Sequence, residues 1–254
     1  VDEEDHLAAI VQLVTLEKEW VPSVPGASLY IRPAMIATEA ALGVHASETY
    51  LHFIIAGPVG AYFKEGFNPI PVYISEKHRR AVRGGVGAAK TGGNYAASLF
   101  VSDHAAAQGY SQVLWLDAVN GRYVEEVGAM NICFVYEGQQ IVTPPLSDSI
   151  LDGVTRDSVL KLAPDMGYEV KEEPVDVFEM LADLRAGKIT EVFGCGTAAV
   201  IAPVGRFGFQ GEDIIINNNK PGIVAERLFQ ALTDIQYGRV EDQYDWTLKT
   251  EVDR

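Results

Sequence analysis

The sequence has few of the residues from which redox, metal and nucleic-acid sites are built. Its 254 residues include two cysteines and five histidines, and 20 basic residues stand against 35 acidic ones. Cys133 and Cys195 are too far apart in sequence for a C-x-x-C motif, and no histidine cluster accompanies them. No metal site is therefore expected, and both cysteines are predicted to be buried thiols in a reducing cytoplasm.

The charge balance and the lack of long apolar runs exclude two further classes of partner. The formal net charge of −15 repels phosphate backbones and anionic lipid, so we expect no nucleic-acid partner. No apolar run approaches the ~18 residues of a membrane span, and no signal-like segment opens the chain. The expectation is a cytoplasmic globular protein that has no membrane partner.

Hydrophobic patterning predicts that helices and strands are mixed along the chain. Helices are expected within residues 1–20, 95–109, 155–167, 177–187 and 222–238. Strands are expected over 28–38, 49–57, 112–145 and 189–204, the third range being folded at an Asn120-Gly121 hairpin. The proline-containing residues 64–77 are interpreted as a connection between domains. Because strict βαβ alternation is absent, these elements predict an α/β or mixed α+β fold rather than a doubly wound sheet.

Residues 84–95, GGVGAAKTGGNY, place one lysine, Lys90, among five glycines. Read from Gly84, the run differs from the phosphate-loop pattern G-x-x-x-x-G-K-[ST] at Ala89. The charged stretch HRRAVR also precedes it, where a phosphate loop follows a buried strand. The alternative is a nucleophilic lysine that forms a Schiff base with a carbonyl, above all with pyridoxal phosphate.

That lysine chemistry requires an acid for the pyridine nitrogen and a helix N-terminus or turn for the phosphate. The run EEVGAMN supplies Glu125 and Glu126, and the alternation of a strand predicts that one faces the interior and the other solvent. GVTRDS opens a helix near Thr155, and GCGTAAV is a glycine turn. Taken singly, these features are equally typical of surface acids, a helix cap and a tight turn.

Together, several fragments resemble the branched-chain-amino-acid aminotransferases, the fold type IV enzymes that depend on pyridoxal phosphate. In order, they are SLYIRP, GPVGAYF, GGVGAAKTGGNYAASL, QVLWLD, EEVGAMN, VTPPLSDSILDGVTRDSVL, EVFGCGTAAVIAPV and LTDIQYG. The resemblance spans nearly the whole chain. It implies a two-domain enzyme, with residues 1–63 as the remainder of a small N-terminal domain, 64–78 as an interdomain loop and 79–254 as a large cofactor-binding domain.

The resemblance also implies a role for each matching residue. Lys90 matches the lysine that holds the cofactor as an internal aldimine and moves the α-proton, and Tyr95 matches the tyrosine beside the cofactor's phenolic oxygen. Glu126 matches the acid at the pyridine nitrogen, and Arg80 matches an arginine on the same side. The other cofactor-binding matches are Asn131, Val154, Thr155 and Thr197. The substrate-binding matches are Tyr30, Arg32, Thr197 and Ala198.

The implied reaction is transamination of Leu, Ile and Val with 2-oxoglutarate by a homodimer that binds these amino acids, glutamate and their 2-oxo acids. Tyr62 and Phe63 are expected to wall an apolar substrate pocket. Family members carry, before the first helix of this chain, a segment with an arginine at the phosphate, so we expect a small domain truncated at its N-terminus. The alternatives are a D-amino-acid aminotransferase or lyase of the same fold type, a phosphate-loop protein, and an inactive fragment that lacks that arginine.

Overall fold

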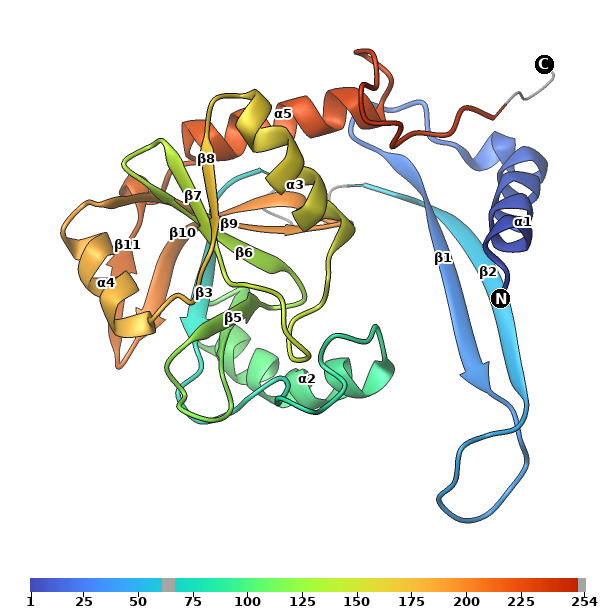
Figure 1. The fold of residues 1–254 in the computed structure, drawn as a ribbon, viewed down its shortest axis with the longest axis horizontal. Helices are drawn as coiled ribbons and strands as arrows, with labels where there is room; N and C mark the ends of the chain where they lie inside the picture. The colour runs from blue at the N-terminus through green and yellow to red at the C-terminus, as the bar shows by residue number, and fades with distance from the viewer. Residues whose placement is uncertain (61–66, 251–254) are drawn as a thin grey trace. The chain divides into compact units, whose positions relative to one another are not determined.

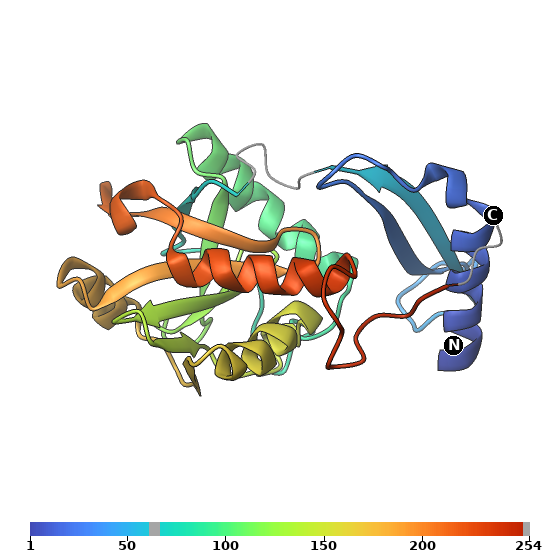
Figure 2. The same cartoon turned by 90° about the horizontal axis from the view of Figure 1, so that it is seen from above.

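The structure is a computed structural model that describes residues 1–60 and 67–250. The chain divides into two compact units: unit 1 is Val1–Lys64 with Asp245–Arg254, and unit 2 is Glu65–Tyr244. Figures 1 and 2 show the elements of each unit in two views. The predicted domain boundary at residues 63–64 lies outside the described residues. Within the described part of the chain, no helix is long and apolar enough to cross a bilayer.

Unit 1 consists of a helix packed on a two-stranded antiparallel sheet (Figure 1). Helix α1 (Glu3–Leu16) begins at Asp2, whose carboxylate accepts hydrogen bonds from two main-chain N–H groups of the acidic first turn. A single 3-10 turn (Lys18–Trp20) follows it. Strand β1 (Ser28–Ala37) pairs with β2 (Tyr50–Val59). The prediction that β2 ends at Gly57-Pro58 is wrong: a strand with one paired edge tolerates a proline that cannot donate.

Unit 2 is built on a nine-stranded sheet with helices packed around it (Figure 2). The strand order is β5-β4-β3-β10-β9-β6-β7-β8, and β11 pairs with β10. The strands are β3 (Ile70–Ile74), β4 (Gln112–Leu116), β5 (Val124–Val127), β6 (Asn131–Tyr136), β7 (Gln140–Thr143), β8 (Glu169–Glu172), β9 (Ile189–Gly196), β10 (Val200–Phe209) and β11 (Glu212–Ile215). The helices are α2 (Gly92–Ala107), α3 (Val154–Asp165), α4 (Val177–Arg185), α5 (Ile223–Gln236) and a 3-10 turn, Asn217–Asn219. Parallel and antiparallel pairs are mixed, as the predicted α/β class requires.

Strand β3 corrects the interpretation of residues 64–77 as a connection. It lies between β4 and β10 in the middle of the sheet, and Ile70, Val72 and Ile74 are fully buried. Pro71 fits there because the register of β10 shifts opposite it, next to Gly205, while its carbonyl accepts a hydrogen bond from the Ser111 N–H. A proline usually indicates a connection because it cannot donate a hydrogen bond within a sheet. A bulge in the neighbouring strand lets the proline lie inside the sheet.

The core of unit 2 contains both cysteines and a narrow stripe of α2. Cys133 and Cys195 are free and fully buried, as expected. On α2, Val101 and Ala105 are buried, whereas Leu99 is 61% exposed. A helix of small residues has a narrow buried stripe, and Leu99 lies outside it.

Candidate functional site

The candidate site of unit 2 is formed by two loops that are held together by close contacts. We name residues 84–90 the lysine loop and residues 147–151 the serine loop. The Gly84 N–H donates to Asp148 Oδ2 over 2.6 Å. A Cβ at Gly87 would lie 2.5 Å from Ser149 Cα, so only glycine permits this approach. Gly87 of the lysine loop is therefore required by the contact with the serine loop.

The side chain of Lys90 lies at the end of this loop, just before α2 begins. The Asn94 side chain fixes the turn, because its Nδ2 donates to the carbonyls of Val86 (2.7 Å) and Ala89 (2.8 Å). In the same first turn of α2, Tyr95 places its hydroxyl 3.1 Å from Lys90 Nζ. The structure thus brings together the predicted lysine and tyrosine on an accessible surface, with the Tyr95 side chain 41% exposed.

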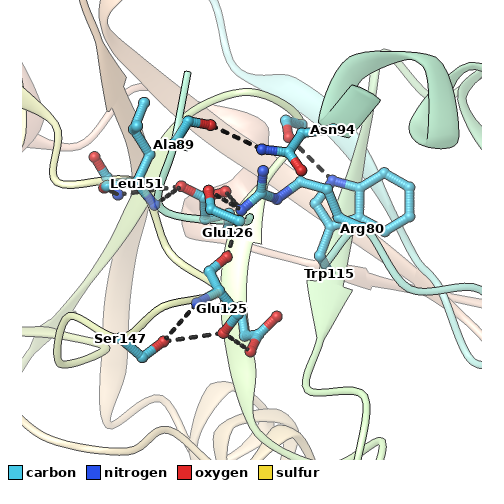
Figure 3. Close-up of polar contacts among 12 residues, drawn as sticks. Arg80, Ala89, Asn94, Trp115, Glu125, Glu126, Ser147 and Leu151 are labelled. Atoms are coloured by element: carbon cyan, nitrogen blue, oxygen red, sulfur yellow. Dashed lines mark hydrogen bonds and ion pairs between the residues drawn. The ribbon is translucent and has the colours of Figure 1, made fainter. Parts of the chain in front are cut away.

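Glu126 on β5 is held by three groups from different parts of unit 2. Its Oε2 lies 2.6 Å from Arg80 Nη2, and both side chains are more than nine-tenths buried. Its Oε1 accepts hydrogen bonds from the Leu151 N–H (3.1 Å) and from Asn131 Nδ2 (3.4 Å). Arg80 in turn donates to the carbonyl of Ser149. Figure 3 shows Arg80 beside Glu126. The predicted residues Arg80, Glu126 and Asn131 therefore form one connected polar cluster.

Two opposing effects, burial and nearby positive groups, set the pKa of Glu126. Burial raises the pKa of Glu126 to about 7, while the charges of Arg80 and Lys90 and the hydrogen bond from Leu151 lower it. A buried acid in this balance becomes fully ionised when a further positive group binds beside it. The carboxylate is therefore suited to a cationic N–H of a ligand.

Glu125 corrects the prediction that one acid of this pair faces solvent. Glu125 and Glu126 are 7% and 3% exposed, because both faces of β5 are covered. Glu125 points to the serine loop, where its Oε1 lies 2.5 Å from Ser149 Oγ. Strand alternation does set the two side chains apart, but it does not say what covers either face.

The N-terminus of α3 is open to a ligand. Its N-cap residue, Gly153, provides no side-chain cap, whereas Asp2, Asp176 and Glu191 accept hydrogen bonds from the first N–H groups of other helices. A Cβ at Gly153 would lie 2.2 Å from Asn131 Oδ1, so the helix start packs directly on the cluster around Glu126. Unpaired N–H groups at a helix N-terminus form an anion site. Val154 is 78% exposed and Thr155 is 7% exposed at this end.

The turn between β9 and β10 is brought to the same end of the sheet. Cys195 on β9 pairs with Asn131 on β6, so the residues that follow Gly196 lie next to the cluster around Glu126. Thr197 and Ala198 form this turn and are exposed. Their main-chain and hydroxyl groups are therefore accessible to a ligand.

The other predicted substrate residues belong to unit 1. Tyr30 and Arg32 are alternate residues of β1 and lie on one face, where Arg32 Nη2 donates to the Tyr30 hydroxyl over 2.5 Å. Tyr62 and Phe63 lie outside the described residues. The roles of all four therefore stay predictions.

Comparison with known proteins decides the family. A family model described as amino-transferase class IV matches residues 1–207. The chain belongs to the class IV aminotransferases. A probable branched-chain-amino-acid aminotransferase of Staphylococcus epidermidis is 50% identical over 250 residues, which are 98% of this chain and 70% of the relative. The branched-chain-amino-acid transaminase 1 of Bacillus subtilis is 49% identical over the same shares of both chains.

Solved structures of class IV aminotransferases share this fold. The branched-chain amino acid aminotransferase of Escherichia coli superposes with a TM-score of 0.80 at 31% identity, covering 98% of this chain and 77% of that one. The branched-chain amino acid aminotransferase from Thermobaculum terrenum, in its PLP-form, gives a TM-score of 0.71 at 26% identity, covering 91% of this chain and 69% of that one. The predicted fold type IV architecture is confirmed, and the phosphate-loop alternative is set aside.

Two residues of this aminotransferase site were missed at the level of sequence. Ser149 and Leu151 contact Arg80 and Glu126 through main-chain atoms, which carry no residue-specific signal. The run VTPPLSDSILDGVTRDSVL did contain both of them. Its polar, proline-rich start was a sign of a loop that docks beside the site.

Proposed function

We propose that the protein transfers the amino group of the branched-chain L-amino acids Leu, Ile and Val to 2-oxoglutarate, as a pyridoxal-phosphate-dependent branched-chain-amino-acid transaminase. The observation that carries this proposal is the identity of about 50% over nearly the whole chain with enzymes of that name. The cluster of Lys90, Tyr95, Arg80 and Glu126 in unit 2 supports it, because it provides an amine, a hydroxyl and a buried acid.

The groups of the site suit pyridoxal phosphate. The ring nitrogen needs an acid, and Glu126 is buried with its pKa raised to about 7, so it is ionised by a cationic N–H. The phosphate needs N–H donors, and α3 begins without a side-chain cap. When bound, the protonated ring supplies an electron sink that stabilises the charge left at the α-carbon after its proton is removed.

Lys90 and Tyr95 then act on the amino-acid end of the reaction. Lys90 Nζ anchors the cofactor and, once free and unprotonated, takes the α-proton from the substrate. The Tyr95 hydroxyl, 3.1 Å from Nζ, orients the amine and hydrogen-bonds to the cofactor's phenolic oxygen. Because Nζ is close to this hydroxyl before any ligand arrives, little reorganisation is required.

The ring nitrogen of the cofactor is assigned to a second group of residues, which consists of Arg80, Glu126 and Asn131. Glu126 accepts a hydrogen bond from the protonated ring nitrogen, and the Arg80 guanidinium at 2.6 Å keeps the carboxylate in place. Asn131 contacts both Glu126 and the start of α3, where Val154 and Thr155 donate main-chain N–H groups to the phosphate. The Thr197 hydroxyl completes the phosphate site.

The proposal assigns substrate recognition to Thr197 and Ala198 in unit 2 and, separately, to Tyr30 and Arg32 in unit 1. The N–H groups of the turn bind the α-carboxylate, and Tyr30 and Arg32 contribute polar groups for the distal carboxylate of glutamate. Discrimination among Leu, Ile and Val is small, since one methylene changes binding by about 1 to 3 kcal/mol. The proposal includes a cytoplasmic homodimer as the working form.

Visible absorption of the purified protein with added pyridoxal phosphate tests this function. We expect absorption by bound cofactor that falls on addition of L-leucine and returns with 2-oxoglutarate, with glutamate formed in equal amount. Lys90→Ala is expected to abolish both changes, and Lys161→Ala serves as a control because Lys161 is exposed and forms an exposed ion pair with Asp157. Reaction with D-leucine but not L-leucine would instead support another enzyme of the same fold type.

A further inference from the structure

Glu125 is a buried carboxyl group that the proposed reaction does not use. The residue is 7% exposed, yet its Oε2 has no hydrogen-bond partner within the described residues. It faces away from Glu126, because adjacent residues of β5 lie on opposite sides of the strand. An ionised carboxylate here would bury a charge with one oxygen unsatisfied, which is costly.

If the carboxyl group of Glu125 carries a proton, its contacts form a chain of hydrogen bonds in which each group donates to the next. Its Oε1 lies 2.5 Å from Ser149 Oγ, which lies 2.9 Å from Ser147 Oγ. A protonated Oε1 donates to Ser149 Oγ, whose own hydroxyl then donates to Ser147 Oγ. The remaining Oε2 is then a neutral carbonyl oxygen, for which the absence of a partner costs far less than for a carboxylate.

Ser149 connects this carboxyl to the other acid of the pair. Its hydroxyl contacts Glu125, and its carbonyl accepts a hydrogen bond from Arg80 Nη2. The same Nη2 lies 2.6 Å from Glu126 Oε2 (Figure 3). Arg80 is therefore paired directly with Glu126 and linked to Glu125 only through Ser149, so an ionised Glu125 would have no direct cationic partner among the described residues.

The charged groups near Glu125 oppose one another and do not outweigh the effect of burial. Arg80 and Arg83 favour its ionised form, whereas Asp117 at the end of β4 opposes it. Burial is the largest influence and raises the pKa of Glu125. A cavity of about 280 Å³, lined by Glu125 with Arg83, Asp117, Tyr123 and Ser147, lets the proton exchange with solvent.

We propose that Glu125 is a positioning residue that keeps its proton in the folded enzyme and, through Ser149, holds Arg80 against Glu126. The inference rests on the proposed function, in which Glu126 is the partner of the cofactor's ring nitrogen. Glu125 touches neither cofactor nor substrate. What it supplies is a neutral hydrogen-bond donor, so a neutral amide of the same shape replaces it and an apolar side chain does not.

Substitution of Glu125 separates the hydrogen bond from the charge. In the holoenzyme, Glu125→Ala is expected to lower cofactor affinity and kcat about tenfold, because Arg80 is no longer fixed, while the KM for leucine is unchanged. Glu125→Gln is expected to restore most of both losses. Glu241→Ala and Glu241→Gln are the controls, since Glu241 is exposed, and both are expected to match the wild type. If Glu125→Gln loses as much as Glu125→Ala, the group is ionised and the proposal is overturned.

Infrared spectroscopy provides a second measurement that does not depend on activity. The wild type minus Glu125→Gln difference spectrum at neutral pH is expected to contain the carbonyl band of a protonated carboxyl group. Absence of that band overturns the proposal even if the alanine variant folds poorly. A wild type that shows the band but binds no pyridoxal phosphate would contradict the proposed function instead, so the two failures are distinguishable.

Discussion

Arg80 Nη2 lies 2.6 Å from Glu126 Oε2, and both side chains are more than nine-tenths buried. The pair joins the segment before the lysine loop to β5, and Arg80 also reaches the carbonyl of Ser149. A buried ion pair contributes little net stability when it is intact, but removal of one partner leaves an uncompensated charge in the interior. The relationship therefore makes both stability and cofactor binding depend on Arg80.

Replacement of Arg80 by glutamine tests this dependence. We expect Arg80→Gln to lower the free energy of unfolding by about 3 kcal/mol, measured by urea denaturation of the cofactor-free protein. The control is Arg185→Gln, because Arg185 forms an exposed pair with Glu212 at 3.5 Å. Exposed pairs contribute less than about 1 kcal/mol, so equal losses in the two variants would contradict the assignment.

The pKa of Glu126 predicts a pH dependence of stability with a definite sign. Burial raises this pKa from 4.5 to about 7, so between these values the folded protein binds more protons than the unfolded chain. Glu126 therefore contributes stability at low pH that is lost as pH rises toward about 7, a change of about 3 kcal/mol. The difference in unfolding free energy between wild type and Glu126→Gln is expected to fall over this range, whereas Glu241→Gln leaves the wild-type profile unchanged. If this difference in unfolding free energy rises with pH, the pKa of Glu126 is not raised by burial and the prediction is wrong.

The sequence was sufficient to predict most of the helices and strands and to name Arg80, Glu126 and Asn131, which the structure brings into one polar cluster. Lys90, Glu126 and the start of α3 each stand in a local pattern, and the order of those patterns along the chain resembled one family. Helix starts such as Asp2 and glycine turns were equally local, since caps and turns depend on a few neighbouring residues.

Features that depend on what lies opposite a residue could not be predicted in this way. Pro71 was read as a strand breaker because the shift of β10 that accommodates it belongs to a segment far along the chain. Glu125 was assigned to one of two faces, but the serine loop that covers its face is also distant in sequence. Tertiary contact overrides local propensity at such positions.

The hydroxyl of Tyr95 is predicted to orient the reactive amine. In Tyr95→Phe, Lys90 Nζ loses the partner 3.1 Å away, and under the proposed function the phenolic oxygen of the cofactor loses a hydrogen bond. We expect kcat for leucine to fall by about tenfold or more, with a shifted pH dependence of the visible absorption of the bound cofactor. Tyr50→Phe is the control because Tyr50 is exposed on β2. An unchanged absorption profile in Tyr95→Phe would show that the hydroxyl does not act on this site.

The glycines of GGVGAAKTGGNY are predicted to differ sharply in their tolerance of a methyl group. At Gly87 a Cβ would lie 2.5 Å from Ser149 Cα and 2.6 Å from Ala81 Cβ, so Gly87→Ala must push the lysine loop away from the serine loop. At Gly93, in the first turn of α2, a Cβ would meet nothing within 4 Å. We therefore expect thermal unfolding to show a loss of about 1 to 3 kcal/mol for Gly87→Ala. Gly93→Ala is expected to be neutral or to gain about 0.5 to 1 kcal/mol, because alanine restricts the unfolded chain and favours the helix. Equal effects at both positions would mean that the two loops do not meet at Gly87.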